Sequence, residues 1–493
     1  MEVVKNKTLL VIFFLGAILR VLLVEQQSLW MDEASVYYES FGQTISDTWA
    51  KRHRLQPQNA PLLPLIVSWA TQALEVNSFL SFRYFSVFLG ILSLFVIYKF
   101  GKEYFGNNRQ SYLLLTLVAI SSFHIQFSQL IRFYILLFTF FYLHLYLSLR
   151  WFKSKSNITL IFIFLAAMLG CWTNQLMALS FFISSLLFIV RYGFSFKRLV
   201  IFNSINVLAF ATYLPSYLLY INGRFKIGSF RNIGIGDFGY MLKSIMLPKH
   251  IGPSLLELRF LQHNQFNLDI IYNFLNVRLG FELILLLTFF IIWVCVFKNI
   301  KRIGKESFVF IFTILFFTSY LFFKKVPLNA RYFLIFTPIM MVVLIQGLEL
   351  FTRYKNRLFV FVVIINLYSS LNYFFDSRHH TLNTKKIFTL LSPKNNYVSL
   401  DSSRFYMRYF RKNFINKRIN IVENLVDRSL YDQYLPEYFR KLDNFTFIFT
   451  YRSILKLKNL DLLFDHLEKT HSKTELHAGV DPYFRMFKFE RSK

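Results

Sequence analysis

Two adjacent carboxylates, Asp32 and Glu33, follow the first long apolar run of the chain, within the stretch SLWMDEASVYYES. A carboxylate that reaches a hydroxyl group can remove its proton and so act as a general base. The aromatic residues around the pair are typical of a membrane–water interface. A structural role is equally open for Asp32, because aspartate is favoured at the N-cap of a helix.

Arginines stand near one end of several apolar runs. Arg20 lies inside the first run, Arg83 opens the second, Arg132 lies in the turn QFSQLIR, and Arg331 opens a late run. Guanidinium groups bind phosphate through paired hydrogen bonds, and they are costly in apolar surroundings unless they find a partner. Snorkelling towards lipid headgroups would account for any one of them. The four together predict one polar cavity that faces the acidic pair.

The composition places these residues in a membrane protein. Of the 493 residues, 55% are hydrophobic and 17% are charged, and Phe and Tyr number 62 and 28. This much apolar surface excludes a cytosolic enzyme and a disordered chain. The formal charge of +29 indicates basic loops between spans rather than binding of nucleic acid. Cys171 and Cys295 both lie in apolar runs, so we expect no metal site, and the chain has no phosphate-binding loop that would indicate ATP or another cofactor.

Runs of about 17 to 20 mostly apolar residues predict membrane-spanning helices. No cleavage site follows the first run, which we therefore expect to be retained rather than removed as a signal peptide. The predicted spans are 8–24, 80–98, 110–126, 133–149, 157–172, 177–191, 199–220, 280–298, 307–323, 331–350 and 358–375.

Residues 60–74 are apolar but short, and two prolines open them. If this segment lies along the interface, the basic clusters at 99–109, 150–155, 191–198, 298–305 and 353–357 all face the cytoplasm, as the positive-inside bias predicts. We therefore expect eleven spans plus one interfacial helix, with the N-terminus inside. A twelfth span is the alternative.

The extracytoplasmic face then carries the loop 25–79, the turn 126–132, the loop 221–279 and everything after residue 375. The turn 324–331 also faces outward, although Lys324, Lys325 and Arg331 make it basic. Basic groups on that side need an anionic partner, and lipid headgroups are the simplest one.

The tail is expected to be a small α/β domain at 376–493, outside the membrane and separate from a membrane domain at 1–375. Short apolar runs at 397–400, 419–422, 445–449 and 484–489 suit strands, and 460–469 has helical spacing. The scattered histidines of the tail indicate surface residues rather than a metal site.

Together these features predict group transfer from a lipid phosphate. The arginines would hold the phosphate, which leaves as a stabilised anion, while Asp32 removes the proton of the acceptor hydroxyl. One displacement assisted by one base inverts the configuration of a sugar carbon. A donor already activated in the membrane needs no ATP.

The order of these features resembles the GT-C membrane glycosyltransferases, in the branch of the protein O-mannosyltransferases and the bacterial aminoarabinose-to-lipid-A transferases. The similarity runs from residue 10 to about residue 350. The similar elements are Leu19-Arg20, SLWMDEA, the helix from Pro61 to Leu74, Arg83, FGKEYFG (100–106), SQLIRFYIL (128–136) and NARYFLIFTP (329–338).

The resemblance implies an inverting transfer of a sugar from a polyprenyl-phosphate donor to a lipid, glycan or protein hydroxyl. It implies an α-helical polytopic membrane protein of the inner (plasma) membrane, whose active site faces the periplasm or outside. It assigns catalysis to Asp32, with Glu33 beside it, and contacts with the donor phosphate to Arg83, Arg132, Arg331, Lys324 and Lys325.

The sequence departs from the family pattern at two places. Gln58 and Asn59 stand where many relatives carry a His or Lys beside the proline of the interfacial helix. Leu130 follows Gln129, where relatives usually carry an acidic residue. Both departures concern the donor pocket, so we expect this pocket to be built differently.

Other classes of protein stay open. A transporter would show two matching halves with broken helices, whereas Pro215 and Pro338 are isolated. A binding or structural protein would not need charges inside the bilayer. A lipid-linked glycan polymerase or ligase also has basic outer loops, and the loop 221–279 carries Arg224, Lys226, Arg231, Lys243, Lys249 and Arg259.

Overall fold

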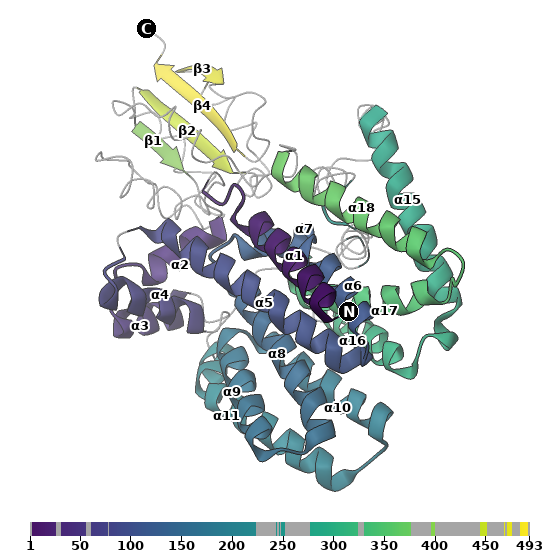
Figure 1. The fold of residues 1–493 in the computed structure, drawn as a ribbon. Helices are drawn as coiled ribbons and strands as arrows, with labels where there is room; N and C mark the ends of the chain where they lie inside the picture. The colour runs from purple at the N-terminus through teal and green to yellow at the C-terminus, as the bar shows by residue number, and fades with distance from the viewer. Residues whose placement is uncertain are drawn as a thin grey trace. The chain divides into compact units, whose positions relative to one another are not determined.

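The computed structural model in Figure 1 is an assembly of helices with a small sheet near the C-terminus. It describes residues 2–25, 31–55, 61–76, 78–222, 243, 246, 248–251, 277–323, 330–375, 396–399, 444–450, 468, 471–475 and 484–491. The chain divides into two compact units. One comprises Met1–Val24 and Gly42–His379, and the other comprises Glu25–Phe41 and His380–Lys493.

The first unit is helical throughout its described residues. Its helices are α1 (Glu2–Val21), α3 (Ile45–Leu55), α4 (Leu62–Ala73), α5 (Phe82–Phe105), α6 (Asn108–Ala119), α7 (Ser122–Ser128), α8 (Phe133–Ser154), α9 (Asn157–Thr173), α10 (Ala178–Tyr192), α11 (Phe196–Asn222), α15 (Val277–Lys298), α16 (Lys305–Phe323), α17 (Thr337–Glu349) and α18 (Lys355–Phe375). Short 3₁₀ helices precede α5, α10 and α17, and the last of these is Ala330–Phe336.

The chain is an α-helical polytopic membrane protein, as the sequence predicts. In the described residues seven helices are long and apolar enough to cross a membrane, or eight if one bent pair forms a single span. The bent pair corrects a detail of the expectation, because the predicted span 110–126 is α6 and α7, which meet at 61°. The other predicted spans also fall on helices, although the full number of eleven stays a prediction.

Salt bridges join several helix ends at one face of the unit. The Lys153 ammonium lies 2.8 Å from the Glu103 carboxylate and so joins the ends of α8 and α5. Arg191, at the end of α10, donates to the Glu306 carboxylate at the start of α16 and to the Tyr104 carbonyl. These are the ends that the charge bias assigns to one side of the membrane.

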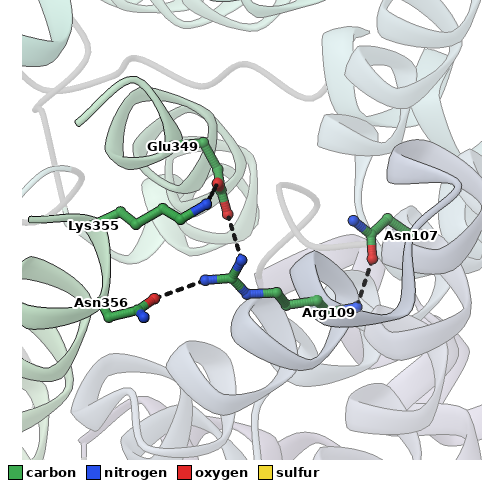
Figure 2. A network of polar contacts seen from close by, with 5 residues as sticks. All are labelled: Asn107, Arg109, Glu349, Lys355 and Asn356. Carbon is green, nitrogen blue, oxygen red and sulfur yellow. Dashed lines mark hydrogen bonds and ion pairs between the residues drawn. The ribbon is translucent and has the colours of Figure 1, made fainter. Parts of the chain in front are cut away.

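A second network brings α6, α17 and α18 to each other at their ends (Figure 2). Glu349 accepts from Lys355 at 2.9 Å and lies 3.8 Å from Arg109. Arg109 also donates to Asn356 at 2.8 Å, and its backbone amide is capped by Asn107. Arg109 and Lys355, from two of the predicted basic clusters, therefore both contact the Glu349 carboxylate, which places these helix ends on the same side of the bundle.

The opposite ends of α1 and α5 also meet. Arg83, in the first turn of α5, donates to the carbonyl of Val24, which follows α1. The chain must therefore cross the membrane an even number of times between these two points. Helix α4 has 12 residues and so extends about 18 Å, too short for a full span. This geometry agrees with the expected interfacial placement of α4.

The second unit contains α2 (Met31–Ser40) and a four-stranded sheet. The strands are β1 (Asn396–Ser399), β2 (Asn444–Thr450), β3 (His471–Glu475) and β4 (Phe484–Arg491), in the order β1-β2-β4-β3. Strands β1 and β2 are parallel and the other pairs are antiparallel. In the register of β2 and β4, Phe445 is paired with Phe489 and Phe447 with Phe487.

Three of the strands predicted in the tail are confirmed, at β1, β2 and β4. Strand β3 was missed because its sequence, HSKTE, carries no apolar pattern. The predicted strand at 419–422 and nearly all of the predicted helix at 460–469 lie outside the described residues. The domain boundary expected between residues 375 and 376 falls at the end of a described range, and the residues that follow it are outside the described ranges.

The shared face can be tested with single cysteines in a background that lacks Cys171 and Cys295. Lys102 lies exposed in the last turn of α5, Arg353 lies exposed in the turn between α17 and α18, and Leu430 belongs to the tail. Each is replaced by cysteine in turn. We expect the first two to be shielded from a membrane-impermeant maleimide in intact cells and labelled after permeabilisation, with Leu430→Cys labelled in both conditions. Labelling of positions 102 and 353 from opposite sides would contradict the shared face.

Candidate active site

The break between α6 and α7 is held by Arg20, which is fully buried. Its guanidinium donates to the carbonyls of Ala119 at 3.0 Å and Val118 at 3.2 Å, in the last turn of α6. It also donates to the Gly16 carbonyl at 2.7 Å and lies 2.7 Å from Nδ1 of His124. Arg20 thus satisfies the end of a helix, and the expectation that it faces a cavity with the other arginines is not met.

His124 continues this contact across the bundle. Because Arg20 can only donate, Nδ1 of His124 is an acceptor and its proton lies on Nε2. Nε2 in turn lies 3.0 Å from the hydroxyl of Ser93 in α5. A side chain at Gly90 would collide with Ser128, so α5 and α7 approach closely here. The orientation of α7 is therefore fixed from two sides.

The chain that leaves α1 is held by side chains from three helical segments. The Gln129 amide donates to the carbonyls of Arg20 at 2.9 Å and Leu22 at 2.8 Å, and the Tyr373 hydroxyl donates to Gln129 at 2.9 Å. Arg83 donates to the Val24 carbonyl at 3.1 Å. Leu23 adopts a left-handed backbone (φ +57°), which is a strained conformation for leucine. The Ser-Gln pattern of the sequence thus has a structural role at the exit of α1.

Arg132 lies at the N-cap of α8 with an extended backbone and is only 6% exposed. Its guanidinium lies 5.4 Å from the ring of Phe133 and 5.8 Å from the ring of Tyr134. Tyr134 packs edge-to-face on Phe127, which packs on Phe123 in the same way. We call Phe123, Phe127, Phe133 and Tyr134 the aromatic cluster. The positive end of the α8 dipole adds to the positive potential beside it.

A second cation contacts the same aromatic cluster. The Lys249 ammonium lies 4.6 Å from the ring of Phe123 and 5.2 Å from that of Phe127, and it donates to the side-chain oxygen of Gln126. Within the described ranges, no carboxylate pairs with Lys249. Lys249 lies in the connection between α11 and α15, outside the membrane-spanning helices, and its burial lowers its pKa from 10.5 to about 7, aided by the charge of Lys243.

A pocket opens beside Lys249 within the first unit. Its apolar lining includes Met246, Phe289, Trp293, Met340 and Leu344, from the connection before α15, α15 and α17. Ser121, Ser122, Thr337 and Asn366 add hydroxyl and amide groups to its wall. Lys249 thus lies at the edge of a small, mostly apolar pocket that has a few hydroxyl and amide groups in its wall.

The remaining predicted site residues are placed only in part. Asp32 lies in the first turn of α2, inside the helix rather than before it, and its side chain is outside the described residues. Glu33 is fully buried in the same unit. Arg331 lies in the 3₁₀ helix Ala330–Phe336, with its guanidinium 5.6 Å from the ring of Tyr332. Lys324 and Lys325 are outside the described residues.

Sequence reasoning did not single out Lys249, which it counted only among the basic residues of a long loop. The hydrogen bond between Lys249 and Gln126 joins residues more than 120 positions apart, so no local motif could predict it. Gln129 was recognised as part of a turn, but its bonds to the α1 carbonyls could not be read from the spacing.

Comparison with known proteins gives similarity in structure only. No protein-family model and no curated protein sequence matches the chain. It is similar to the crystal structure of ArnT from Cupriavidus metallidurans bound to undecaprenyl phosphate (TM-score 0.49, 10% identity) and to the apo form (TM-score 0.49, 9% identity), over 99% of this chain and 97% of that one. It is also similar to the Archaeoglobus fulgidus oligosaccharyltransferase tethered with an acceptor peptide (TM-score 0.45, 11% identity), over 99% of this chain and 74% of the other.

These TM-scores are below 0.5 and about a tenth of the residues are identical, so the likenesses decide nothing about this chain. The chemistry has to be argued from the residues of this chain.

The lowered pKa of Lys249 predicts a pH-dependent stability. Between about pH 7 and 10.5 the unfolded chain holds a proton on Lys249 that the folded chain has lost, so the free energy of unfolding rises with pH over this window. Below pH 7 Lys249 is protonated in the folded chain as well, and the full cost of burying its charge lowers the free energy of unfolding. We therefore expect Lys249→Met to raise the unfolding temperature at pH 6.5 more than at pH 9, measured on purified protein in detergent.

Lys153→Met is the control, because this ammonium pairs with Glu103 near the surface. It should change the unfolding temperature equally at both pH values. An equal effect of Lys249→Met at both would show that Lys249 stays protonated in the folded chain.

Proposed function

We propose that the chain is a glycosyltransferase that moves a sugar from a polyprenyl-phosphate donor to an acceptor hydroxyl, with inversion at the sugar carbon. One observation carries this proposal: two cations, Arg132 and Lys249, contact one aromatic cluster inside a bundle of apolar helices. For Lys249, the described residues offer no carboxylate as a partner. A bound lipid phosphate would supply a negative charge that favours the protonated form of Lys249.

The two cations fit the leaving group rather than the sugar. As the bond between the sugar carbon and the phosphate oxygen breaks, its electron pair moves onto the phosphate, whose charge increases. A guanidinium binds this charge in paired hydrogen bonds, and an ammonium adds a point charge. Both interactions strengthen in the transition state, which is the requirement for catalysis. No general acid is needed for such a leaving group.

The acceptor side of the reaction needs one base. The acceptor oxygen attacks the sugar carbon from the face opposite the phosphate, and its proton passes to a carboxylate. We assign this role to Asp32, with Glu33 beside it in α2. Inversion follows from a single displacement. The bond cleaved is already activated, so the reaction balances without ATP.

The other residues predicted to contact the donor phosphate are supported either by their place in the fold or by the family resemblance alone. Arg83 is buried, and part of its guanidinium holds the exit of α1, so we assign it to positioning as well as to the donor phosphate. Arg331, Lys324 and Lys325 keep the role that the resemblance implies. We propose that the site and residues 376–493 face the extracytoplasmic side of the inner (plasma) membrane, where a lipid, glycan or protein provides the hydroxyl.

A lipid-linked glycan polymerase or ligase is the second candidate. The observation in its favour is that Lys249 comes from the loop 221–279, whose basic residues are the mark of that class. Both candidates share the lipid phosphate. They differ in the transferred group, which is one sugar in the first and an assembled glycan in the second.

Asp32→Asn tests the base. The variant should fold and bind the donor normally, because the side chains are equal in size, while transfer falls by roughly 100-fold or more since no group takes the proton. Transfer of radiolabelled sugar from a polyprenyl-phosphate donor by the purified protein, with the lipid and glycan products separated by chromatography, measures this and distinguishes the two candidates. Normal turnover by Asp32→Asn would refute the assignment.

Lys249→Met and Arg132→Ala test the phosphate site. Each should weaken binding of undecaprenyl phosphate by roughly tenfold or more, since each removes a cation from a site with little water. Equilibrium binding to the detergent-solubilised protein measures it. Arg109→Ala is the matched control, because it removes an arginine at the opposite end of α6 and should leave the affinity unchanged. Unaltered binding in both site variants would exclude this cluster as the phosphate site.

A further inference from the structure

The last helix, α18, ends in an unusual row of buried polar residues. Ser369, Ser370, Asn372 and Tyr373 are all at most 4% exposed, although they lie in a helix apolar enough to span the membrane. Buried polar groups are costly unless hydrogen-bonded, so each one here is expected to hold something. All four have partners in other segments of the first unit.

Two of these residues hold the backbone of His250 at both ends. The amide of His250 donates to the Ser369 hydroxyl at 3.1 Å, and the carbonyl of His250 accepts from the Asn372 amide at 2.9 Å. The ring of His250 packs against Tyr373, with ring centres 5.0 Å apart. Residues 369 and 372 are three apart and so lie on one face of α18. We call this pair of hydrogen bonds the His250 clamp.

The same row also holds the start of α7. The Ser369 hydroxyl lies 2.7 Å from that of Ser122, and the Ser370 hydroxyl donates to the Ile120 carbonyl at 2.5 Å. Helix α7 carries Phe123, Gln126 and Phe127, which are the three contacts of Lys249. One turn of α18 therefore fixes both the loop that carries Lys249 and the helix that receives its ammonium.

Asn372 is itself held in place by a buried acid. Its amide also donates to Glu282 of α15 at 3.1 Å, and Tyr368 donates to the same carboxylate oxygen at 3.2 Å. Glu282 is fully buried. An amide with both of its hydrogens directed to fixed acceptors has one orientation, which gives the clamp a defined geometry.

We infer that Ser369 and Asn372 are positioning residues, which place the Lys249 ammonium over the aromatic cluster by holding the backbone of His250. This inference rests on the proposed function for the ligand, a lipid phosphate, but the clamp itself is a property of the fold. A shift of about 1 Å in a charged group that binds phosphate costs a substantial part of its effect. Loss of the clamp should therefore lower the affinity for the ligand, and only through its effect on the position of Lys249.

A double-mutant cycle tests this dependence. Affinity for undecaprenyl phosphate is measured for the full-length protein with Ser369→Ala or Asn372→Leu, each in the natural background and in a Lys249→Met background. We expect a loss of roughly tenfold in the natural background and no further loss when Lys249 is absent, because coupled residues are not additive. Ser148→Ala is the matched control, since its buried hydroxyl bonds only to a carbonyl of its own helix.

An equal loss in both backgrounds would overturn the inference, since the two residues would then act on the ligand without Lys249. No loss in the natural background would also overturn it. Asn372→Leu leaves Glu282 with fewer donors and can fail to fold, and in that case Ser369→Ala, which removes one hydroxyl, decides the question.

Hydrogen exchange separates this inference from the proposed function. If Lys249→Met does not change the affinity, the phosphate role of Lys249 fails. The clamp then stands on the backbone amide of His250, whose exchange should be about tenfold faster in Ser369→Ala than in the natural protein and unchanged in Ser148→Ala. Unchanged exchange in Ser369→Ala would show that the clamp does not hold the loop.

Discussion

The interruption of a membrane helix between residues 119 and 122 is stabilised by the buried guanidinium of Arg20, together with the Ser370 hydroxyl that donates to Ile120. Inside an apolar bundle, carbonyls at a helix end have no water to bond to, so a break is stable only where another group donates to them. Arg20 does this for Val118 and Ala119, and its fork of donors also reaches Gly16 and His124. A lysine could not, because its three donors radiate from one point. The direction of α7, and so the place of the aromatic cluster, follows from this contact.

The membrane helices could be predicted from the sequence because a span needs only length and apolar composition. Charge bias predicts that the basic clusters share one side, and the carboxylate shared by Arg109 and Lys355 agrees with this for two of them. That this side is the cytoplasm stays a prediction. The bend at 61° could not be predicted, since Ser121 and Ser122 interrupt a run that keeps its hydropathy. Strand β3 was invisible for the opposite reason, because an exposed edge strand needs no apolar residues.

For the candidate site, the sequence indicated residues but not their geometry, and the chemical roles of these residues stay predictions. Charges near apolar runs led to Arg83 and Arg132, and both are buried as expected. The residue type alone could not predict that Arg83 donates to a backbone carbonyl whereas Arg132 packs over aromatic rings. Lys249 differs from the paired bases at the opposite face, where Glu103, Glu306 and Glu349 stand close to lysines and arginines. Only the fold distinguishes a basic residue paired with a carboxylate from one packed against aromatic rings.

Hydrogen bonds between distant parts of the chain set the stage of synthesis at which the candidate site can assemble. Tyr373 reaches Gln129 across 244 positions, and Ser370 reaches Ile120 across 250. At about 5 to 20 residues per second, a ribosome needs roughly ten to fifty seconds to pass from the earlier residue to the later one. During that interval α7 and the exit of α1 are already made but lack their final partners. The emerging polypeptide therefore cannot assemble the candidate site until α18 has been inserted, and a fragment that stops before α18 lacks these partners.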